Sequence, residues 1–152
     1  MRTRQILCPT DFSETASHAL SYAIEMANLY RVNIRLLHVM STPYGEHNYG
    51  EHNFGIVAES SEELKKKLEA YSEEKLAELI AEIEPAMDDL LSVTPVIRCG
   101  DIFARILEDS VENEVGMIVI ASHGHTGLSH MLHPNVADAL ANKAKCPVLV
   151  VK

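Results

Sequence analysis

The sequence has no tryptophan, few other aromatic residues and only three cysteines among its 152 residues. So few cysteines, in odd number, exclude a disulfide-stapled secreted domain and favour reduced thiols in a cytoplasmic protein. No apolar run is long enough for a membrane span or a signal peptide. Basic residues are outnumbered, 13 against 22 acidic, for a formal net charge of −9. Binding to nucleic acid or to an anionic membrane through bulk charge is therefore not expected.

Several common catalytic motifs are missing as well. The first predicted strand runs into Pro-Thr-Asp-Phe-Ser, which excludes the Gly-x-Gly-x-x-Gly fingerprint of dinucleotide-binding oxidoreductases. The chain also lacks the Gly-Lys-Ser/Thr of a P-loop, the Gly-x-Ser-x-Gly elbow and a Cys-x-x-Cys pair. Asp11 is the only acid in the loops after the first and fourth predicted strands, too few for a paired-carboxylate mechanism. No nucleophile with an adjacent base can be named, so a conventional enzyme is not favoured.

What the sequence does contain is regular hydrophobic patterning. Hydrophobic residues make up 47% of the chain, and its length suits a single domain, which we place at residues 1–152. Short apolar runs alternate with segments of helical periodicity, which predicts an α/β fold with a five-stranded parallel sheet and helices on both faces. The predicted strands are residues 6–9, 33–40, 93–98, 117–120 and 148–151.

Individual residues mark the ends and the order of these elements. Ser13 and Asp101 are expected to cap the helices that follow the first and third strands, because their side-chain oxygens can accept the first free amides. Pro95 lies inside the third strand, where it removes a donor from the hydrogen-bond ladder. The third strand is therefore predicted to lie at an edge of the sheet.

A long connection is expected between the second strand and the second helix, at about residues 41–59. It contains a tandem duplication, because Tyr-Gly-Glu-His-Asn occurs at residues 44–48 and again at residues 49–53. Its glycines and polar residues predict a mobile insertion that is dispensable for folding. Ser60 and Glu63 form a capping box, which predicts that the second helix begins there. This helix is expected to bury one apolar face, formed by Leu64, Leu68, Tyr71, Leu76, Leu79, Ile80 and Ile83.

Residues 116–152 form the stretch around which the candidate site is predicted. A buried strand is followed by a loop of small and turn-forming residues at 121–127, and Pro134 with Asn135 marks the start of the next helix. A loop between a buried strand and a helix N-terminus is where α/β folds bind anions. If the first and fourth strands are neighbours, this loop meets residues 9–11 at the carboxyl edge of the sheet.

Three parts of the sequence resemble motifs of the universal stress protein family, in the family's order and spacing. They are residues 6–13, residues 37–39, and residues 121–127 together with 146–151. The resemblance implies an adenine-nucleotide α-hydrolase-like fold with strand order 3-2-1-4-5. It also implies a stress-response regulator with a small-molecule or protein partner. It further implies a homodimer, and the apolar last strand would lie at a sheet edge, where it can pair with a second copy.

The resemblance also assigns site residues, position by position. On the adenosine side they are Pro9, Thr10, Asp11 and Val39, and on the phosphate side they are Ala121, Gly124, Gly127, Asn135 and Val136. ATP-binding members are similar in having Gly-x-x-Gly, nine residues, and then Gly-Ser/Thr. Here the spacing is kept, but the first glycine is replaced by Ala121 and the final pair by Pro134 and Asn135. Alanine adds a methyl group and proline offers no N–H, so we expect a degenerate site that binds AMP or ATP weakly.

Half of the eight histidines lie in or shortly after the loop at residues 121–127. They are His123, His125, His130 and His133. Imidazole binds metals when neutral and anions when protonated, but this spacing matches no zinc pattern and no cysteine joins it. A chance surface cluster is favoured over a metal or pH-sensing site, so a metal is not expected. Two alternatives to the regulator stay open, a slow ATP hydrolase that uses Asp11 with a metal and a histidine-rich metal-binding module.

Overall fold

The computed structural model describes the backbone of residues 4–40, 54–122 and 134–152, and the side chains of residues 4–40, 62–122 and 136–152. Strands and helices alternate along these residues as the sequence predicts. Only single residues at the strand ends differ from the predicted bounds. The elements are β1 (Ile6–Pro9), α1 (Glu14–Tyr30), β2 (Ile34–Met40), α2 (Phe54–Ile83), η1 (Glu84–Ala86), β3 (Val93–Cys99), α3 (Ile102–Glu112), β4 (Met117–Ala121), α4 (Pro134–Lys143) and β5 (Val148–Val151).

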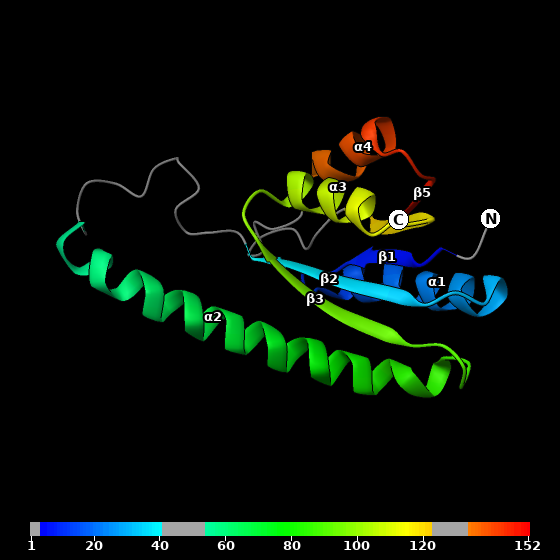
Figure 1. Ribbon diagram of the computed structural model, residues 1–152, viewed down its shortest axis with the longest axis horizontal. Coiled ribbons are helices and arrows are strands. Elements are labelled where there is room, and N and C mark those ends of the chain that lie inside the picture. Colours follow the sequence, from blue (N-terminus) through cyan, green and yellow to red (C-terminus); the bar gives the residue numbers. More distant parts are fainter. Residues whose placement is uncertain (1–3, 41–53, 123–133) are drawn as a thin grey trace.

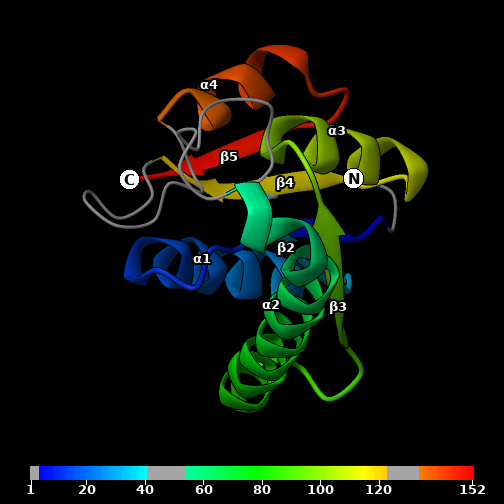
Figure 2. The same cartoon turned by 90° about the vertical axis from the view of Figure 1, so that its left-hand side faces the viewer.

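The five strands form a parallel sheet in the order β3-β2-β1-β4-β5. The predicted fold class and the strand order 3-2-1-4-5 are therefore confirmed. Helices α1 and α2 cover one face of the sheet, and α3 and α4 cover the other (Figure 1, Figure 2). Because the strands are parallel, their carboxyl ends meet at one edge of the sheet, where α/β folds place their ligand sites.

Alternate strand residues supply two apolar layers, one on each face of the sheet. Ile6 and Cys8 of β1 pack in the layer with α1 and α2, whereas Leu7 packs in the layer with α3 and α4. Successive side chains of a strand point to opposite faces, so a strand covered on both faces is apolar at nearly every position. Burial raises the pKa of Cys8 to about 12, which keeps this thiol protonated and unreactive.

The predicted helix caps at Ser13 and Asp101 and the predicted edge strand are confirmed. The Ser13 hydroxyl accepts the N–H of Ala16 at 3.2 Å and caps α1. Asp101 Oδ1 accepts the N–H of Ala104 at 2.8 Å and caps α3. Pro95 lies in β3, which forms one edge of the described sheet and pairs only with β2 there. Its missing donor therefore breaks no ladder within the described strands.

The predicted start of the second helix is wrong. Helix α2 begins at Phe54, so Ser60 and Glu63 lie inside the helix and form no capping box at its start. The connection predicted at residues 41–59 accordingly ends before Phe54. Its remaining part, residues 41–53, lies outside the described residues, and the predicted mobility stays a prediction. A helix propagates at low cost once nucleated, which allows it to extend past an internal capping signal.

The apolar face predicted for α2 is buried only in its C-terminal half. Leu76 is 1% exposed and belongs to the layer with α1, whereas Leu68 is 37% exposed and Tyr71 is also exposed. The N-terminal half of α2 extends beyond the ends of the strands, so no part of the sheet lies against it (Figure 1). The prediction of one continuous buried face is thus wrong for Leu64, Leu68 and Tyr71.

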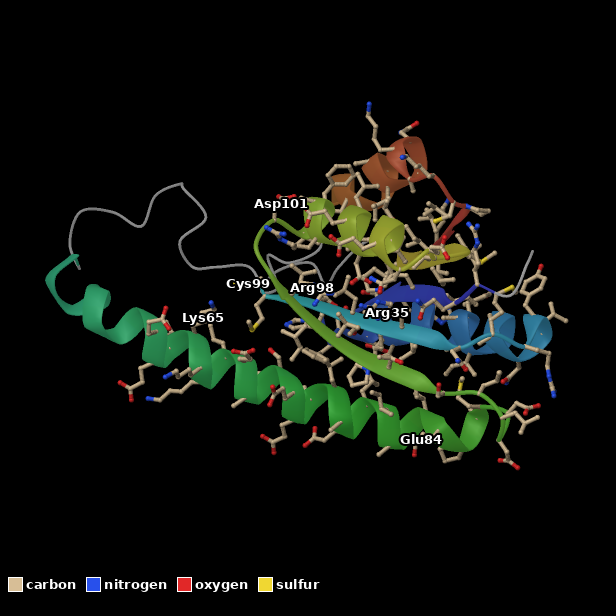
Figure 3. The ribbon with its side chains drawn as sticks, viewed as in Figure 1. Arg35, Lys65, Glu84, Arg98, Cys99 and Asp101 are labelled. Carbon is tan, nitrogen blue, oxygen red and sulfur yellow. The ribbon has the colours of Figure 1, made fainter. Side chains whose placement is uncertain are left out.

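A charged group lies buried between the sheet and α3. The Asp109 side chain of α3 is fully buried and accepts two hydrogen bonds from Arg35, from Nε at 2.6 Å and from Nη2 at 2.9 Å. Arg98 donates a third bond at 3.1 Å. The arginines come from the neighbouring strands β2 and β3 (Figure 3). Hydrogen bonding to Asp109 raises the pKa of Arg35, and the bidentate pair fixes α3 on the sheet.

Candidate functional site

The candidate site lies where β2, β1 and β4 end side by side. β1 ends at Pro9, and the N–H of Thr10 continues the pairing with β2 by donating to the Leu37 carbonyl at 2.8 Å. β4 ends at Ala121, and the N–H of Ser122 donates to the last residue of β5 at 2.7 Å. The loops after β1 and β4 therefore leave adjacent strands at the carboxyl edge, as the sequence predicts for a ligand site of this fold.

Side chains of the loop itself shape the turn after β1. The Thr10 hydroxyl oxygen accepts the N–H of Phe12 at 3.1 Å. Asp11 Oδ1 accepts the N–H of Ser13 at 2.9 Å and also the Ser13 hydroxyl. Phe12 has a φ of 64°, in the left-handed region that aromatic residues rarely adopt. Asp11 thus organises the loop as an Asx turn, and its half-buried carboxylate is at the same time presented at the sheet edge.

A buried histidine lies behind this turn. His38 of β2 is 4% exposed, and its Nδ1 lies 2.8 Å from the Thr10 carbonyl oxygen. Its ring centroid lies 4.5 Å from that of Phe12, with the ring planes tilted by 34°. Burial lowers the pKa of His38 below its usual value, so the ring is neutral at pH 7. No role was predicted for His38, although a histidine inside a buried apolar strand is a signal that a polar partner lies nearby.

The residues assigned to the adenosine side are brought together at this edge, with different degrees of exposure. Pro9, Thr10 and Val39 are buried, and Asp11 is half-buried. The side chain of Val39 belongs to the layer with α3 and α4. Ala121, assigned to the phosphate side, is only 3% exposed and its methyl group packs in the layer with α1. This methyl group is therefore part of the core.

The phosphate side is described only in part. Gly124 and Gly127 lie outside the described residues. Helix α4 begins at Pro134, as predicted, and Asn135 already lies inside its first turn. The backbone amides of Asn135 and Val136 belong to the first turn, whose N–H groups have no acceptor within a helix. This helix N-terminus can therefore still donate to an anion, with one donor fewer because proline has no N–H.

The predicted histidine cluster, formed by His123, His125, His130 and His133, lies outside the described residues. In the part of the chain that the structure describes, no group of three or more histidine, cysteine, aspartate or glutamate residues could hold a metal ion. No helix in the same part is long and apolar enough to cross a membrane.

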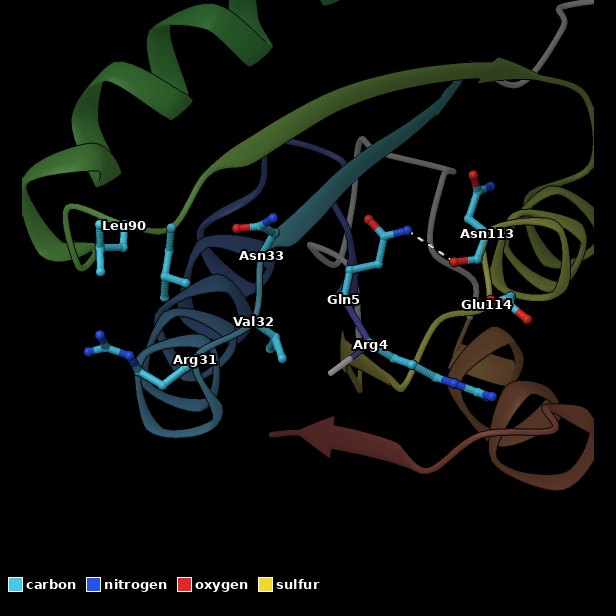
Figure 4. A pocket seen from close by; sticks show the side chains of 9 residues that line it. Arg4, Gln5, Arg31, Val32, Asn33, Leu90, Asn113 and Glu114 are labelled. Carbon is cyan, nitrogen blue, oxygen red and sulfur yellow. Dashed lines mark hydrogen bonds between the residues drawn. The ribbon is translucent and has the colours of Figure 1, made fainter. Parts of the chain in front are cut away.

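A cavity of about 430 Å³ lies at the opposite, amino edge of the sheet (Figure 4). Polar side chains that line it bond to residues of the neighbouring loops at this edge. Gln5 donates to the Asn113 carbonyl at 3.0 Å, and Arg31 forms an ion pair with Asp88. Arg31 has a positive φ because it ends α1, and Glu114 has a positive φ because it lies just after the end of α3. The cavity is thus separate from the candidate site at the carboxyl edge. The positive φ values of its lining residues are explained by the ends of the helices.

Comparison with known proteins agrees with the fold and with the sequence motifs. Residues 2–152 match the universal stress protein family. Universal stress protein MJ0577 of Methanocaldococcus jannaschii is 31% identical to the chain, over 98% of the chain and 94% of that protein. A solved structure of MJ0577 superposes with a TM-score of 0.77 at 32% identity and covers 100% of this chain and 97% of that chain.

Two solved structures with bound nucleotides share the fold at lower identity. One is the universal stress protein from Archaeoglobus fulgidus in complex with dAMP, with a TM-score of 0.63 and 20% identity over the full length of both chains. The other is a universal stress protein in complex with cAMP, with a TM-score of 0.64 and 15% identity over 98% of this chain and 97% of that chain. The family match over nearly the whole sequence and the 31% identity with MJ0577 show that the chain belongs to the universal stress protein family.

Proposed function

We propose that the protein is a stress-response regulator that binds an adenine nucleotide at the carboxyl edge of β2, β1 and β4. The observation that carries this proposal is the turn after β1, which places the buried Thr10 and the half-buried Asp11 beside the end of β2. A carboxylate accepts hydrogen bonds, and the hydroxyl groups of a ribose donate them. Family members with this fold hold dAMP and cAMP, which supports the same ligand class for this chain.

The proposed site holds adenosine better than it holds a chain of phosphates. The adenosine side, formed by Pro9, Thr10, Asp11 and Val39, lies at the carboxyl ends of β1 and β2. On the phosphate side, Pro134 removes one N–H from the first turn of α4, the place where a phosphate would be bound. A hydrogen bond to a charged group contributes about 1.5–3 kcal/mol, so its loss weakens ATP binding about ten- to a hundred-fold.

We therefore expect AMP and adenosine to bind about as tightly as ATP. The double substitution Pro134→Gly with Asn135→Ser should strengthen ATP binding about ten-fold or more and change adenosine affinity less than about three-fold. Ala121→Gly is the matched control, because the methyl group that it removes packs in the core, so it should lower stability without strengthening ATP binding. Titration calorimetry of the three ligands with each variant measures these differences. Low-micromolar ATP binding by the unmodified chain, with preference over AMP, would contradict the weakened phosphate side.

A regulator and a slow hydrolase differ in turnover. Asp11 Oδ1 is engaged by the Ser13 N–H and hydroxyl, which supports a role in shaping the binding loop. We expect no phosphate release from ATP above the buffer rate in the presence of magnesium. Measurable release that is lost in Asp11→Asn would assign the chain to the hydrolase class instead. Both results are independent of the affinity measurements.

We propose further that the protein is a homodimer paired through β5. β5 ends the described sheet opposite to β3, and an apolar edge strand favours pairing with a second copy. Val150→Lys places a charge in this strand and should give monomers, whereas the near-isosteric Val150→Thr should leave the dimer intact. Sedimentation at micromolar concentration distinguishes the states, and a melting curve confirms that each variant is folded. A wild-type chain that sediments as a monomer would refute the proposed dimer.

A further inference from the structure

We propose that His38 is a positioning residue of the adenosine site: its neutral ring donates from Nδ1 to the Thr10 carbonyl and thereby holds Asp11 at a fixed place beside Val39. The expected effect of His38 on adenosine binding rests on the proposed function. Its effect on the turn after β1 can be tested without a ligand. The residue does not touch the proposed ligand in this arrangement, and it acts through the turn after β1.

The bond between His38 and Thr10 defines which ring nitrogen carries the proton. A carbonyl oxygen can only accept, so the Nδ1 atom that lies 2.8 Å from it must be the donor. The side chain is 4% exposed, and water therefore cannot easily replace this bond. Without it the buried Thr10 carbonyl would be left without this partner, which is the costly outcome for a buried polar group.

Thr10 is held to β2 from both of its backbone polar groups. Its N–H donates to the Leu37 carbonyl at 2.8 Å, and its carbonyl accepts from His38, the next residue of the same strand. Val39 follows directly and is the residue that the family resemblance assigns to the adenosine side. The spacing between Val39 and the turn that carries Asp11 is therefore set by these two bonds.

The ring of His38 also supports a backbone conformation that is unfavourable by itself. Phe12 has a φ of 64°, which costs an L-residue energy, and its ring packs on the His38 ring at a centroid distance of 4.5 Å. The Phe12 and Ser13 amides then donate to Thr10 Oγ1 and Asp11 Oδ1. His38 is thus joined to Thr10 by one hydrogen bond and to Phe12 by one ring contact, and both residues belong to the turn that carries Asp11.

Two substitutions separate this role from simple packing. In His38→Asn the side-chain amide nitrogen can occupy the place of Nδ1, whereas in His38→Gln the amide lies one carbon further out. We expect adenosine affinity to fall about ten-fold or more in the glutamine variant and to stay within about three-fold of wild type in the asparagine variant. Titration calorimetry with adenosine measures the affinity, and melting curves report the stability of both variants.

Amide hydrogen exchange at Phe12 and Ser13 tests the same role in the free protein. Exchange should be about ten-fold faster or more in His38→Gln and close to wild type in His38→Asn. Should the glutamine variant not fold, His38→Leu serves in its place, because leucine keeps an apolar side chain and has no donor. Equal behaviour of the asparagine variant and the glutamine variant (or its leucine substitute), in affinity and exchange alike, would overturn the positioning role. A wild-type chain that binds no adenosine would refute the proposed function alone, and exchange would then decide the role of His38.

Discussion

Replacing Asp109 by alanine is expected to lower the free energy of unfolding by about 3–5 kcal/mol, because it leaves the largely desolvated guanidinium of Arg35 without its partner. Arg35 is 13% exposed and bonds to Asp109 through two nitrogens, so it would lose its counter-charge in a place that water reaches poorly. For a chain of this length the melting temperature should fall by about 6–20 °C. Denaturant unfolding and thermal melting both measure the loss.

The second arginine of the group provides a matched control for this prediction. Arg98 bonds to the same carboxylate at 3.1 Å but is 40% exposed, and Asp109 keeps both of its hydrogen bonds to Arg35 when Arg98 is removed. Arg98→Ala should therefore cost about 1 kcal/mol or less, in the range of surface ion pairs. A loss after Asp109→Ala as small as that after Arg98→Ala would show that the buried group contributes little to stability.

The second large effect is expected at Leu76 of α2. Leu76→Ala should lower the free energy of unfolding by about 2–5 kcal/mol, because a buried leucine loses its transfer free energy and leaves a cavity in the layer with α1. The same substitution at Leu68, two turns earlier on the helix, removes a side chain that is 37% exposed. It should cost clearly less, because water already reaches much of this side chain.

Comparison of the two leucine variants in denaturant unfolding therefore maps where α2 is attached to the sheet. A much larger loss for Leu76→Ala would place the attachment in the C-terminal half of the helix, as the burial pattern indicates. Equal losses for the two variants would mean that the N-terminal half is packed against protein in solution. Because Leu68 is 37% exposed in this structure, a further part of the protein would then have to cover it.

Some features of the candidate site could be predicted from the sequence, and others only from the structure. Thr10 and Asp11 were predicted as site residues because their segment resembles the family motif, and they do lie at the carboxyl edge beside β2 and β4. The methyl group of Ala121, which was expected to weaken the phosphate side, packs in the core layer with α1. The phosphate side therefore depends mainly on the missing N–H of Pro134.

Much of the fold was determined by the sequence alone, because the signals involved are local. Unbroken apolar runs mark strands buried on both faces, and their alternation with helices dictates a parallel sheet. Ser13 and Asp101 cap their helices through amides only three residues away, and Pro95 excludes a central strand by its own chemistry. The family resemblance then supplied the strand order and the site, which local patterns do not specify.

Only the tertiary structure decided how distant residues meet. Asp109 and Arg35 are far apart in the chain, and only the packing of α3 on the sheet makes them partners. His38 acquires its role because parallel pairing of β1 with β2 brings the Thr10 carbonyl to its ring. The exposure of Leu68 and the burial of Leu76 on the same helix likewise depend on what packs against each part of α2. A sequence pattern reports which side chains prefer burial, but partners and coverage depend on long-range packing that no single segment contains.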